Sequence, residues 1–232
     1  VNCKKNELME ENYFDRNLSY TDDGRLLDED GKAIMMDWEE PIMKKAAEIV
    51  TRNGGRVLNV GFGMGFIDTF IEDHNIEEHW IIEAHVDVYT KMLQDGWHLK
   101  PHVKILYGDW RWYLQFLPKF DGIYFDTWDE PQEEFDAYIP NILKEDGIYC
   151  FFNNPRFDEH GLHTDPSHYD IITKYATIDY EVMGLDWVDD KDRQNPYNDY
   201  YWNPDWKTYY HPIVKLKKNE RGPQPFGFSR TK

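Results

Sequence analysis

The sequence is poor in cysteine, and this limits the folds and sites that it can encode. Only Cys3 and Cys150 occur among 232 residues, so a disulfide framework and a cysteine-rich metal site are excluded. Cys150 lies in the apolar run 148–152, where we expect a buried free thiol. This usage fits a reducing compartment, and we expect a cytoplasmic protein, with the nucleus as the alternative.

Basic residues are also scarce. Lys and Arg number 26 against 44 Asp and Glu, for a formal net charge of −18. Nucleic-acid binding usually leaves a basic footprint, so no nucleic-acid partner is expected. The negative surface favours a cationic partner or substrate. Solubility alone also explains it, and for charge considered by itself this is the better interpretation.

No apolar run approaches the length of a membrane span, and no signal-peptide pattern opens the chain. We therefore expect no membrane partner. The chain begins with Val1, which leaves open what precedes it. The spacing of His160, His163 and His168 matches no zinc pattern, so a solvated loop is the better interpretation and no metal site is predicted.

What the sequence does contain is a glycine-rich turn at the end of an apolar run. Val57, Leu58 and Val60 predict a short strand, which ends at Gly61-Phe62-Gly63-Met64-Gly65. Apolar residues at helical spacing follow from position 66. In an α/β protein such a strand-turn-helix junction directs backbone N–H groups at a ligand, and the glycines let the ligand approach.

The remaining pattern predicts an α/β protein with a Rossmann-like, doubly wound sheet of seven strands and a C-terminal antiparallel hairpin. Apolar residues make up 41% of the chain and aromatics 16%, enough for one domain with a core and an aromatic-lined cavity, although the aromatics also fit the core alone. A small hairpin is expected at 18–20 and 25–27. Further strands are expected at 79–83, 103–107, 120–128, 147–152, 176–184 and 209–216, and helices at 41–50, 64–73, 86–96, 132–143 and 168–175.

Acids follow several of these strands. Glu83 ends the second strand, eighteen residues after Gly65, where an acid binds ribose hydroxyls in dinucleotide folds. Asp126 ends the fourth strand and should project into the crevice beside the glycine turn. Asp109 and Trp110 follow the third strand and could hold an adenine ring, or Asp109 could cap a helix that contains Trp112 and Phe116.

The third glycine-like position of the dinucleotide fingerprint is Phe66, which disfavours a pyrophosphate. A smaller adenosyl ligand with an amino-acid tail would still fit. A nicotinamide-dependent oxidoreductase stays the alternative from a different class, and a non-catalytic adapter is a third.

Several stretches together resemble class I S-adenosylmethionine-dependent methyltransferases that act on guanidino groups. This branch includes guanidinoacetate methyltransferase and the type IV protein arginine methyltransferases, which modify the internal (δ) nitrogen. The resemblance covers about residues 18–216. The matching stretches are 36–39, 56–65, 79–85, 120–127, 151–153 and 209–212.

The resemblance implies S-adenosylmethionine as cofactor and S-adenosylhomocysteine as product. It implies that Asp126 and Glu39 hold the guanidino group, Asp126 as the base and Glu39 as the clamp, or the reverse. Paired carboxylates match the planar cation independently. The residues predicted to bind the cofactor are Gly61, Phe62, Gly63, Gly65, Glu83, Asp109, Trp110, Met36 and Asp126. The implied substrate-binding residues are Trp38, Glu39, Thr127, Trp128 and Asn153.

The acceptor stays open at this point. Trp128 replaces a tyrosine that helps guanidinoacetate methyltransferase to hold its substrate, which favours an arginine side chain in a protein, such as a basic ribosomal protein. The type IV enzymes carry an N-terminal ankyrin-like region that these residues do not include, so free arginine and guanidinoacetate remain alternatives. We divide the chain into an arm over the active site (1–40), a methyltransferase domain (41–216) and a flexible tail (217–232); the oligomeric state is not predicted.

Overall fold

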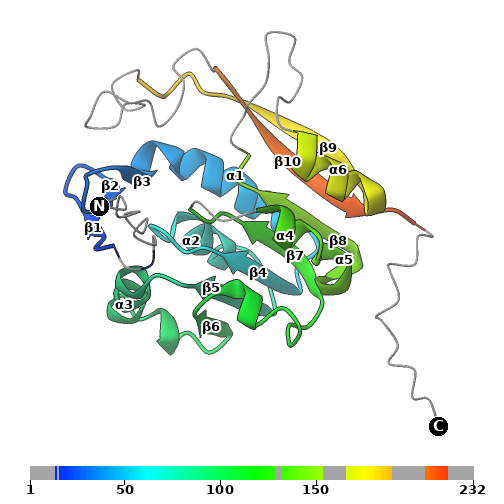
Figure 1. The fold of residues 1–232 in the computed structure, drawn as a ribbon, viewed down its shortest axis with the longest axis horizontal. Coiled ribbons are helices and arrows are strands. Elements are labelled where there is room, and N and C mark those ends of the chain that lie inside the picture. The colour runs from blue at the N-terminus through cyan, green and yellow to red at the C-terminus, as the bar shows by residue number, and fades with distance from the viewer. Residues whose placement is uncertain (1–13, 15, 129–131, 154–165, 190–206, 219–232) are drawn as a thin grey trace, which may run out of the picture.

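The computed structural model describes residues 14, 16–128, 132–153, 166–189 and 207–218. Its main sheet has seven strands in the order β6-β5-β4-β7-β8-β10-β9 (Figure 1). The strands are β4 (Arg56–Val60), β5 (Glu78–Glu83), β6 (Val103–Tyr107), β7 (Phe120–Phe125), β8 (Leu143–Phe151), β9 (Ala176–Gly184) and β10 (Thr208–Leu216). The first five are parallel, and β10 pairs antiparallel with both β8 and β9. The predicted fold class is confirmed.

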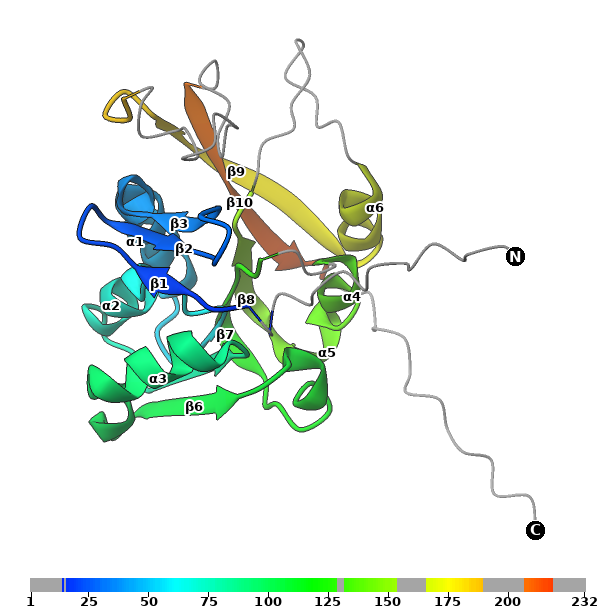
Figure 2. The same cartoon turned by 60° about the vertical axis from the view of Figure 1, so that its left-hand side comes forward.

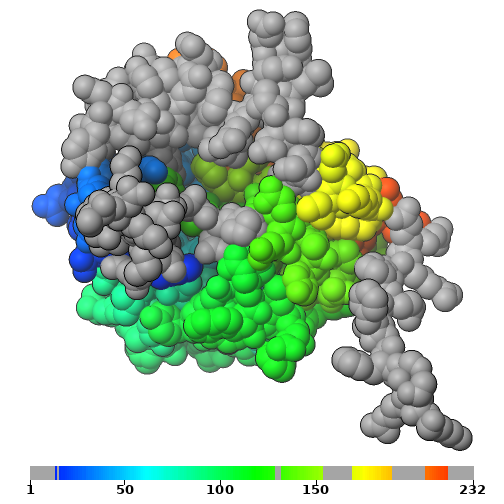
Figure 3. Space-filling view, viewed as in Figure 1, coloured from blue at the N-terminus to red at the C-terminus, as the bar shows by residue number. Residues whose placement is uncertain are grey.

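Helices cover both faces of this sheet. One apolar core lies under α1 (Glu40–Val50), α2 (Phe66–Glu72) and α3 (Val86–Gln94), and includes Met43, Ile71 and Val88. The other lies under α4 (Gln132–Asp136), α5 (Ile139–Ile142) and α6 (Pro166–Tyr175), and includes Phe135 and Ile139. In the space-filling view α6, in yellow, lies against the green α4–α5 segment (Figure 3). Apolar burial on both faces is what a parallel sheet requires.

Two expected helices are wrong. The single helix predicted over 132–143 is divided into α4 and α5, because Pro140 has no N–H to donate to the carbonyl of Asp136. That carbonyl accepts a hydrogen bond from the Tyr175 hydroxyl instead, at 2.7 Å. The helix predicted around Trp112 and Phe116 is only the 3-10 turn η4 (Trp110–Trp112). Trp112 and Phe116 are 65% and 75% exposed, so no buried stripe stabilises a longer helix.

The N-terminal part forms a separate three-stranded antiparallel sheet. The expected hairpin is present as β1 (Ser19–Tyr20) and β2 (Arg25–Leu27), and β3 (Ala33–Met36) adds a strand that the sequence interpretation did not include. Figure 2 shows these strands beside α1 and α2. The 3-10 turn η2 (Asp37–Glu39) then leads directly into α1. This path places Glu39 next to the main sheet.

Some predictions fall outside the described residues. They include His160, His163, most of the expected surface insertion at 185–207, and most of the tail from 217 onward; the side chain of His168 is likewise not described. Within the described ranges, no helix is long and apolar enough to cross a membrane. The same ranges contain no group of three or more His, Cys, Asp or Glu side chains that could hold a metal ion.

Candidate active site

The glycine turn connects β4 to α2 and lies against the end of β7. Gly61 has a φ of 92°, and a Cβ atom at this position would collide with the backbone carbonyl of Asp126. The backbone N–H of Asp126 donates to the carbonyl of Val60 at 2.9 Å. Only glycine combines this φ with such close packing. The turn and Asp126 are therefore adjacent, as the sequence predicted from a neighbouring pair of strands.

The N-terminal sheet contacts the other side of the turn. The Tyr20 hydroxyl donates to the carbonyl of Gly63 at 2.9 Å, and the Met64 N–H approaches the Met35 sulfur at 3.4 Å. A Cβ at Gly63, whose φ is 55°, would lie 2.9 Å from that sulfur. Sequence reasoning did not assign Tyr20 or Met35 to the site, since neither belongs to a recognisable motif.

Glu83 ends β5 and holds the turn through its carboxylate. Its two oxygens accept the N–H groups of Phe62 at 2.8 Å and His85 at 2.6 Å. The side chain is only 6% exposed, and burial raises its pKa to about 7 against the opposing effect of these backbone hydrogen bonds. The backbone N–H groups of Ala84 and Gly63 also lower its pKa. Glu83 is therefore held by the turn itself, and its contact with the ribose of a cofactor stays a prediction.

Asp126 follows β7 with a carboxylate that makes no hydrogen bond or ion pair to another described residue. Burial raises its pKa to about 7. The usual reason to bury an acid is a partner, and the cost of leaving it without one is high. An ionised Asp126 therefore favours a cationic ligand rich in N–H donors.

Glu39 is 1% exposed, and one of its carboxylate oxygens accepts the N–H of Met36 at 2.8 Å. Burial raises the pKa values of the Tyr124 and Tyr209 hydroxyls well above normal, and the charges of Asp126 and Glu39 are among the smaller causes in both. Both carboxylates thus act on the same two buried tyrosines. The structure thus brings the charges of Asp126 and Glu39, 87 positions apart in the sequence, within range of the same two tyrosines.

The other residues predicted to contact the acceptor surround this region. Trp38 is 7% exposed, and its carbonyl accepts the indole N–H of Trp187 at 3.2 Å. The Thr127 hydroxyl is buried and has no partner among the described residues. The Lys32 ammonium lies 5.0 Å from the centre of the Trp128 ring. A contact between these side chains and substrate stays a prediction.

Asn153 is engaged with the protein itself. Its side-chain amide donates to the Tyr210 carbonyl at 2.9 Å and accepts the Tyr169 hydroxyl at 3.0 Å, while its backbone N–H donates to the Tyr209 hydroxyl at 2.8 Å. It therefore connects β8 to β10 and α6. Its predicted substrate contact is untested, but in this structure its hydrogen bonds organise the surrounding elements.

At the predicted adenine site, Asp109 caps the 3-10 turn η4, as the second interpretation of this residue expected. Asp109 accepts the Arg111 N–H at 2.8 Å and forms an ion pair with the Arg111 guanidinium at 3.0 Å. Trp110 is 3% exposed and packs edge-to-face on Phe125 and Phe135. Its indole Nε1 is buried without a partner in the described part of the chain. The adenine contact stays a prediction. Met36 is 1% exposed, and its predicted contact with the cofactor also stays a prediction.

Comparison with known proteins agrees with this geometry. Residues 3–153 match the family model of guanidinoacetate N-methyltransferase. The chain belongs to this family. It therefore belongs to a family of methyltransferases whose cofactor is S-adenosylmethionine, as the resemblance implied.

Relatives and solved structures extend this result. The chain is 39% identical to protein arginine N-methyltransferase 2 of Candida glabrata, over 88% of this chain and 52% of the relative. The protein of the same name from Saccharomyces cerevisiae is also 39% identical, over 87% and 52%. The chain thus spans about half the length of the curated relatives it matches. Spermidine synthase from Thermotoga maritima shares the fold at 17% identity, with a TM-score of 0.54 over 88% of this chain and 73% of that one.

Proposed function

We propose that this protein transfers a methyl group from S-adenosylmethionine to a guanidino nitrogen of arginine. The observation that carries the proposal is a pair of acids. Glu39 is buried, Asp126 follows β7 next to the glycine turn, and both charges raise the pKa of the Tyr124 hydroxyl. The family membership and the arginine methyltransferase relatives support it.

The residues present fit the cofactor. The Gly61–Gly65 turn offers a surface without side chains at three positions, and Glu83 is a buried acceptor beside it. Glu83 would hold the ribose hydroxyls, and the turn would accommodate the amino-acid part. When bound, S-adenosylmethionine supplies a sulfonium methyl group that is already activated for transfer.

The chain's own residues would then prepare the acceptor. A guanidinium has a pKa above about 12, so its nitrogens are poor nucleophiles until a proton leaves. Glu39 would hold two of its N–H groups, and Asp126 would accept the proton as the nitrogen attacks. With its pKa near 7, Asp126 is a stronger base than an ordinary carboxylate. Correct alignment of the two reactants supplies much of the remaining acceleration.

We further propose that the acceptor is the internal (δ) nitrogen of an arginine in a basic protein, such as a ribosomal protein, in the cytoplasm or nucleus. The chain has 44 acidic and 26 basic residues, and this negative charge supports a basic partner. The small-molecule alternative is methylation of guanidinoacetate or free arginine. The alternative from another class, an NAD-dependent oxidoreductase, is disfavoured by the family match.

Incubation with methyl-labelled S-adenosylmethionine and separate acceptors tests these proposals. The acceptors are an arginine-rich ribosomal protein, its counterpart with lysine at each arginine, free arginine and guanidinoacetate. We expect label on the arginine protein only, with mass spectrometry locating the methyl group on the δ nitrogen. Label on free arginine or guanidinoacetate alone would show that the acceptor is a small molecule and not a protein. Label on none of them would contradict guanidino methylation.

A further inference from the structure

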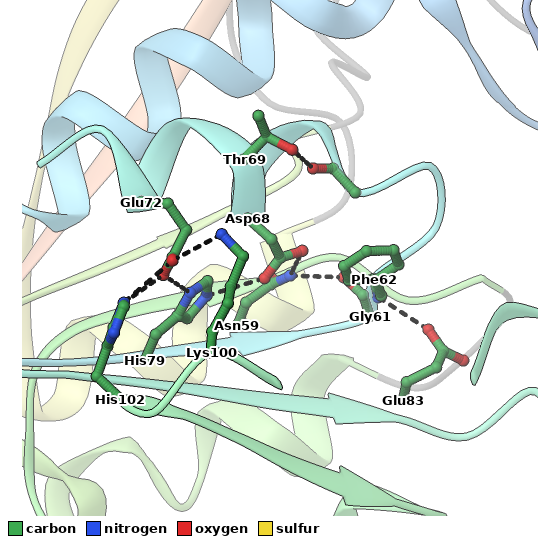
Figure 4. Close-up of polar contacts among 11 residues, drawn as sticks. Asn59, Gly61, Phe62, Asp68, Thr69, Glu72, His79, Glu83, Lys100 and His102 are labelled. Atoms are coloured by element: carbon green, nitrogen blue, oxygen red, sulfur yellow. Dashed lines mark hydrogen bonds and ion pairs between the residues drawn. The ribbon is translucent and has the colours of Figure 1, made fainter. Parts of the chain in front are cut away.

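A buried polar network lies behind the glycine turn, on the side of the sheet that faces α2. It comprises Asn59 on β4, Asp68 and Glu72 on α2, and His79 on β5, with Lys100 and His102 at its outer end (Figure 4). Asn59, Asp68 and His79 are 0% exposed. None of these residues belongs to the site described above.

The inner end of the network bonds directly to the turn. The Asn59 side-chain nitrogen lies 2.9 Å from the Gly61 carbonyl and 2.8 Å from an Asp68 oxygen. Both partners are acceptors, so the nitrogen and not the oxygen of Asn59 must face them. Asp68 therefore orients the amide that holds the carbonyl of Gly61.

The network continues outward through His79. His79 Nε2 lies 3.0 Å from the other Asp68 oxygen, and His79 Nδ1 lies 2.9 Å from a Glu72 oxygen. Burial opposes protonation of His79, but hydrogen bonds to the two acids raise its pKa. Burial also raises the pKa of Asp68. Glu72 also accepts Lys100 and His102 at 3.0 Å each.

Apolar packing connects the same groups to the turn by a second path. The Trp97 ring packs edge-to-face on Phe62, with ring centres 5.3 Å apart, and on His79, with ring centres 6.2 Å apart. Lys100 lies 4.6 Å from the centre of the Trp97 ring. Buried ion pairs contribute little net stability, whereas hydrogen bonds among buried groups restrict the geometry of what they touch. The Asn59 side-chain oxygen is buried without a partner among the described residues, so the network acts on the turn through the Asn59 nitrogen.

We propose that Asp68 and His79 are positioning residues for the cofactor, and that they act through Asn59 on the Gly61–Gly65 turn. This inference rests on the assignment of that turn to S-adenosylmethionine. The network holds the turn in its binding conformation before the cofactor arrives, so that binding does not have to order it. The Asp126 carboxylate itself makes no hydrogen bond to a member of the network.

The test compares Asp68→Asn with Asp136→Asn. Asp136 is also a 0% exposed carboxylate, but it lies on the opposite face of the sheet, where it accepts the Tyr149 hydroxyl at 2.7 Å. We expect Asp68→Asn to raise the Kd for S-adenosylhomocysteine, measured by calorimetry, on the order of tenfold, as loss of a buried hydrogen-bond partner does. The KM for S-adenosylmethionine should rise equally, with the KM for the guanidine and the kcat unchanged. Asp136→Asn should lower the melting temperature without changing the Kd.

An unchanged Kd in Asp68→Asn would overturn the inference, as would an equal rise in Asp136→Asn. If Asp68→Asn does not fold, Glu72→Gln provides the test, with Glu78→Gln as its control because the bonds of Glu78 lie outside the network. Glu72 is further from the turn than Asp68, so we expect the Kd of Glu72→Gln to be only about two- to threefold above that of Glu78→Gln. Equal Kd values in these two variants would overturn the inference. A wild-type protein that does not bind S-adenosylhomocysteine would overturn the cofactor assignment and the inference together. Binding without guanidine methylation would contradict only the proposed acceptor.

Discussion

Two sets of acids in this protein, Glu72 in one and Glu83 with Asp126 in the other, differ in what surrounds them. Glu72 faces His79, Lys100 and His102. Burial raises the pKa of Glu72, but His79 and Lys100 lower it to about 2. Glu83 and Asp126 have no cation within hydrogen-bond distance among the described residues, and burial raises the pKa of each to about 7. Cations of the protein neutralise Glu72, whereas no described cation neutralises Glu83 or Asp126.

This difference distinguishes acids that hold the fold from acids that can bind a ligand. A carboxylate saturated by the protein can hold its neighbours but has nothing left to offer a substrate. A buried carboxylate with free acceptor capacity is costly in the empty protein, and that cost is removed when a cation or hydroxyl group binds. Substitutions in the two sets should therefore affect different quantities.

The largest effect is expected for Asp126. Asp126→Asn and Glu39→Gln should each lower kcat by roughly 10²–10⁴-fold, because each removes a group that orients or deprotonates the guanidinium. The dissociation constant for S-adenosylhomocysteine, measured by calorimetry, should remain close to that of the wild type. Turnover at the wild-type rate in both variants would contradict the proposed mechanism.

A substantial but smaller effect is expected for Glu83. Glu83→Gln should raise the dissociation constant for S-adenosylhomocysteine by about 10- to 100-fold, the range for losing hydrogen bonds to a charged acceptor. The matched control is Glu78→Gln on the same strand, where the acid pairs with Arg56 and Lys104 at the surface. Similar affinities in the two variants would remove Glu83 from the cofactor site.

The two sets should also respond oppositely to pH. The folded-state pKa of Asp126 is raised, so ionisation lowers stability progressively between about pH 4 and pH 7, and the loss is complete above that range. Asp126→Asn should therefore raise the melting temperature at pH 8 and change it little at pH 4.

The folded-state pKa of Glu72 is lowered, so its stabilisation is present above about pH 4.5 and is lost as the pH falls toward 2. Glu72→Gln should lower the melting temperature at pH 8. Calorimetric scans of both variants at several pH values measure the signs. If Asp126→Asn and Glu72→Gln changed the melting temperature at pH 8 in the same direction, the two sets would not differ as described.

The smallest effect is expected at the outer end of the network. Lys100 is 39% exposed in its ion pair with Glu72, so Lys100→Gln should cost about 0.2–1 kcal/mol of unfolding free energy. Denaturant titrations at low and high salt measure this loss, which should shrink as salt increases. A loss that is large and independent of salt would mean that the network is not solvent-screened at this end.

Much of the fold could be predicted from the sequence. Val57 to Gly65 specified a strand and a glycine turn, and the strands at 79–83, 103–107 and 209–216 were found within about a residue. These segments combine apolar periodicity with strong end signals. The helix over 132–143 failed because Pro140, a local signal, interrupts it, and the prediction did not take this into account. The bond from Tyr175 to the Asp136 carbonyl that Pro140 leaves unpaired is long-range, and no local pattern reveals it.

The candidate site was only partly accessible. Glu39 and Asp126 were identified through the family resemblance and the position of Asp126 at a strand end. His79 and Asp68 gave no signal, since a histidine and an acid eleven positions apart are common in any helix-to-strand connection. Tyr209 was quoted as part of a matching stretch without a role, and the structure shows it bonded to Asn153 and influenced by both acids.

The sequence by itself determined the order of strands and helices, the glycine turn, and the presence of acids after β5 and β7. These features depend on hydrogen bonding and apolar spacing between near neighbours in the chain. Only the tertiary structure decided which acids are neutralised by the protein and which remain for a ligand. That distinction depends on burial and on charges from distant segments: His79 reaches Glu72, while no described cation reaches Asp126.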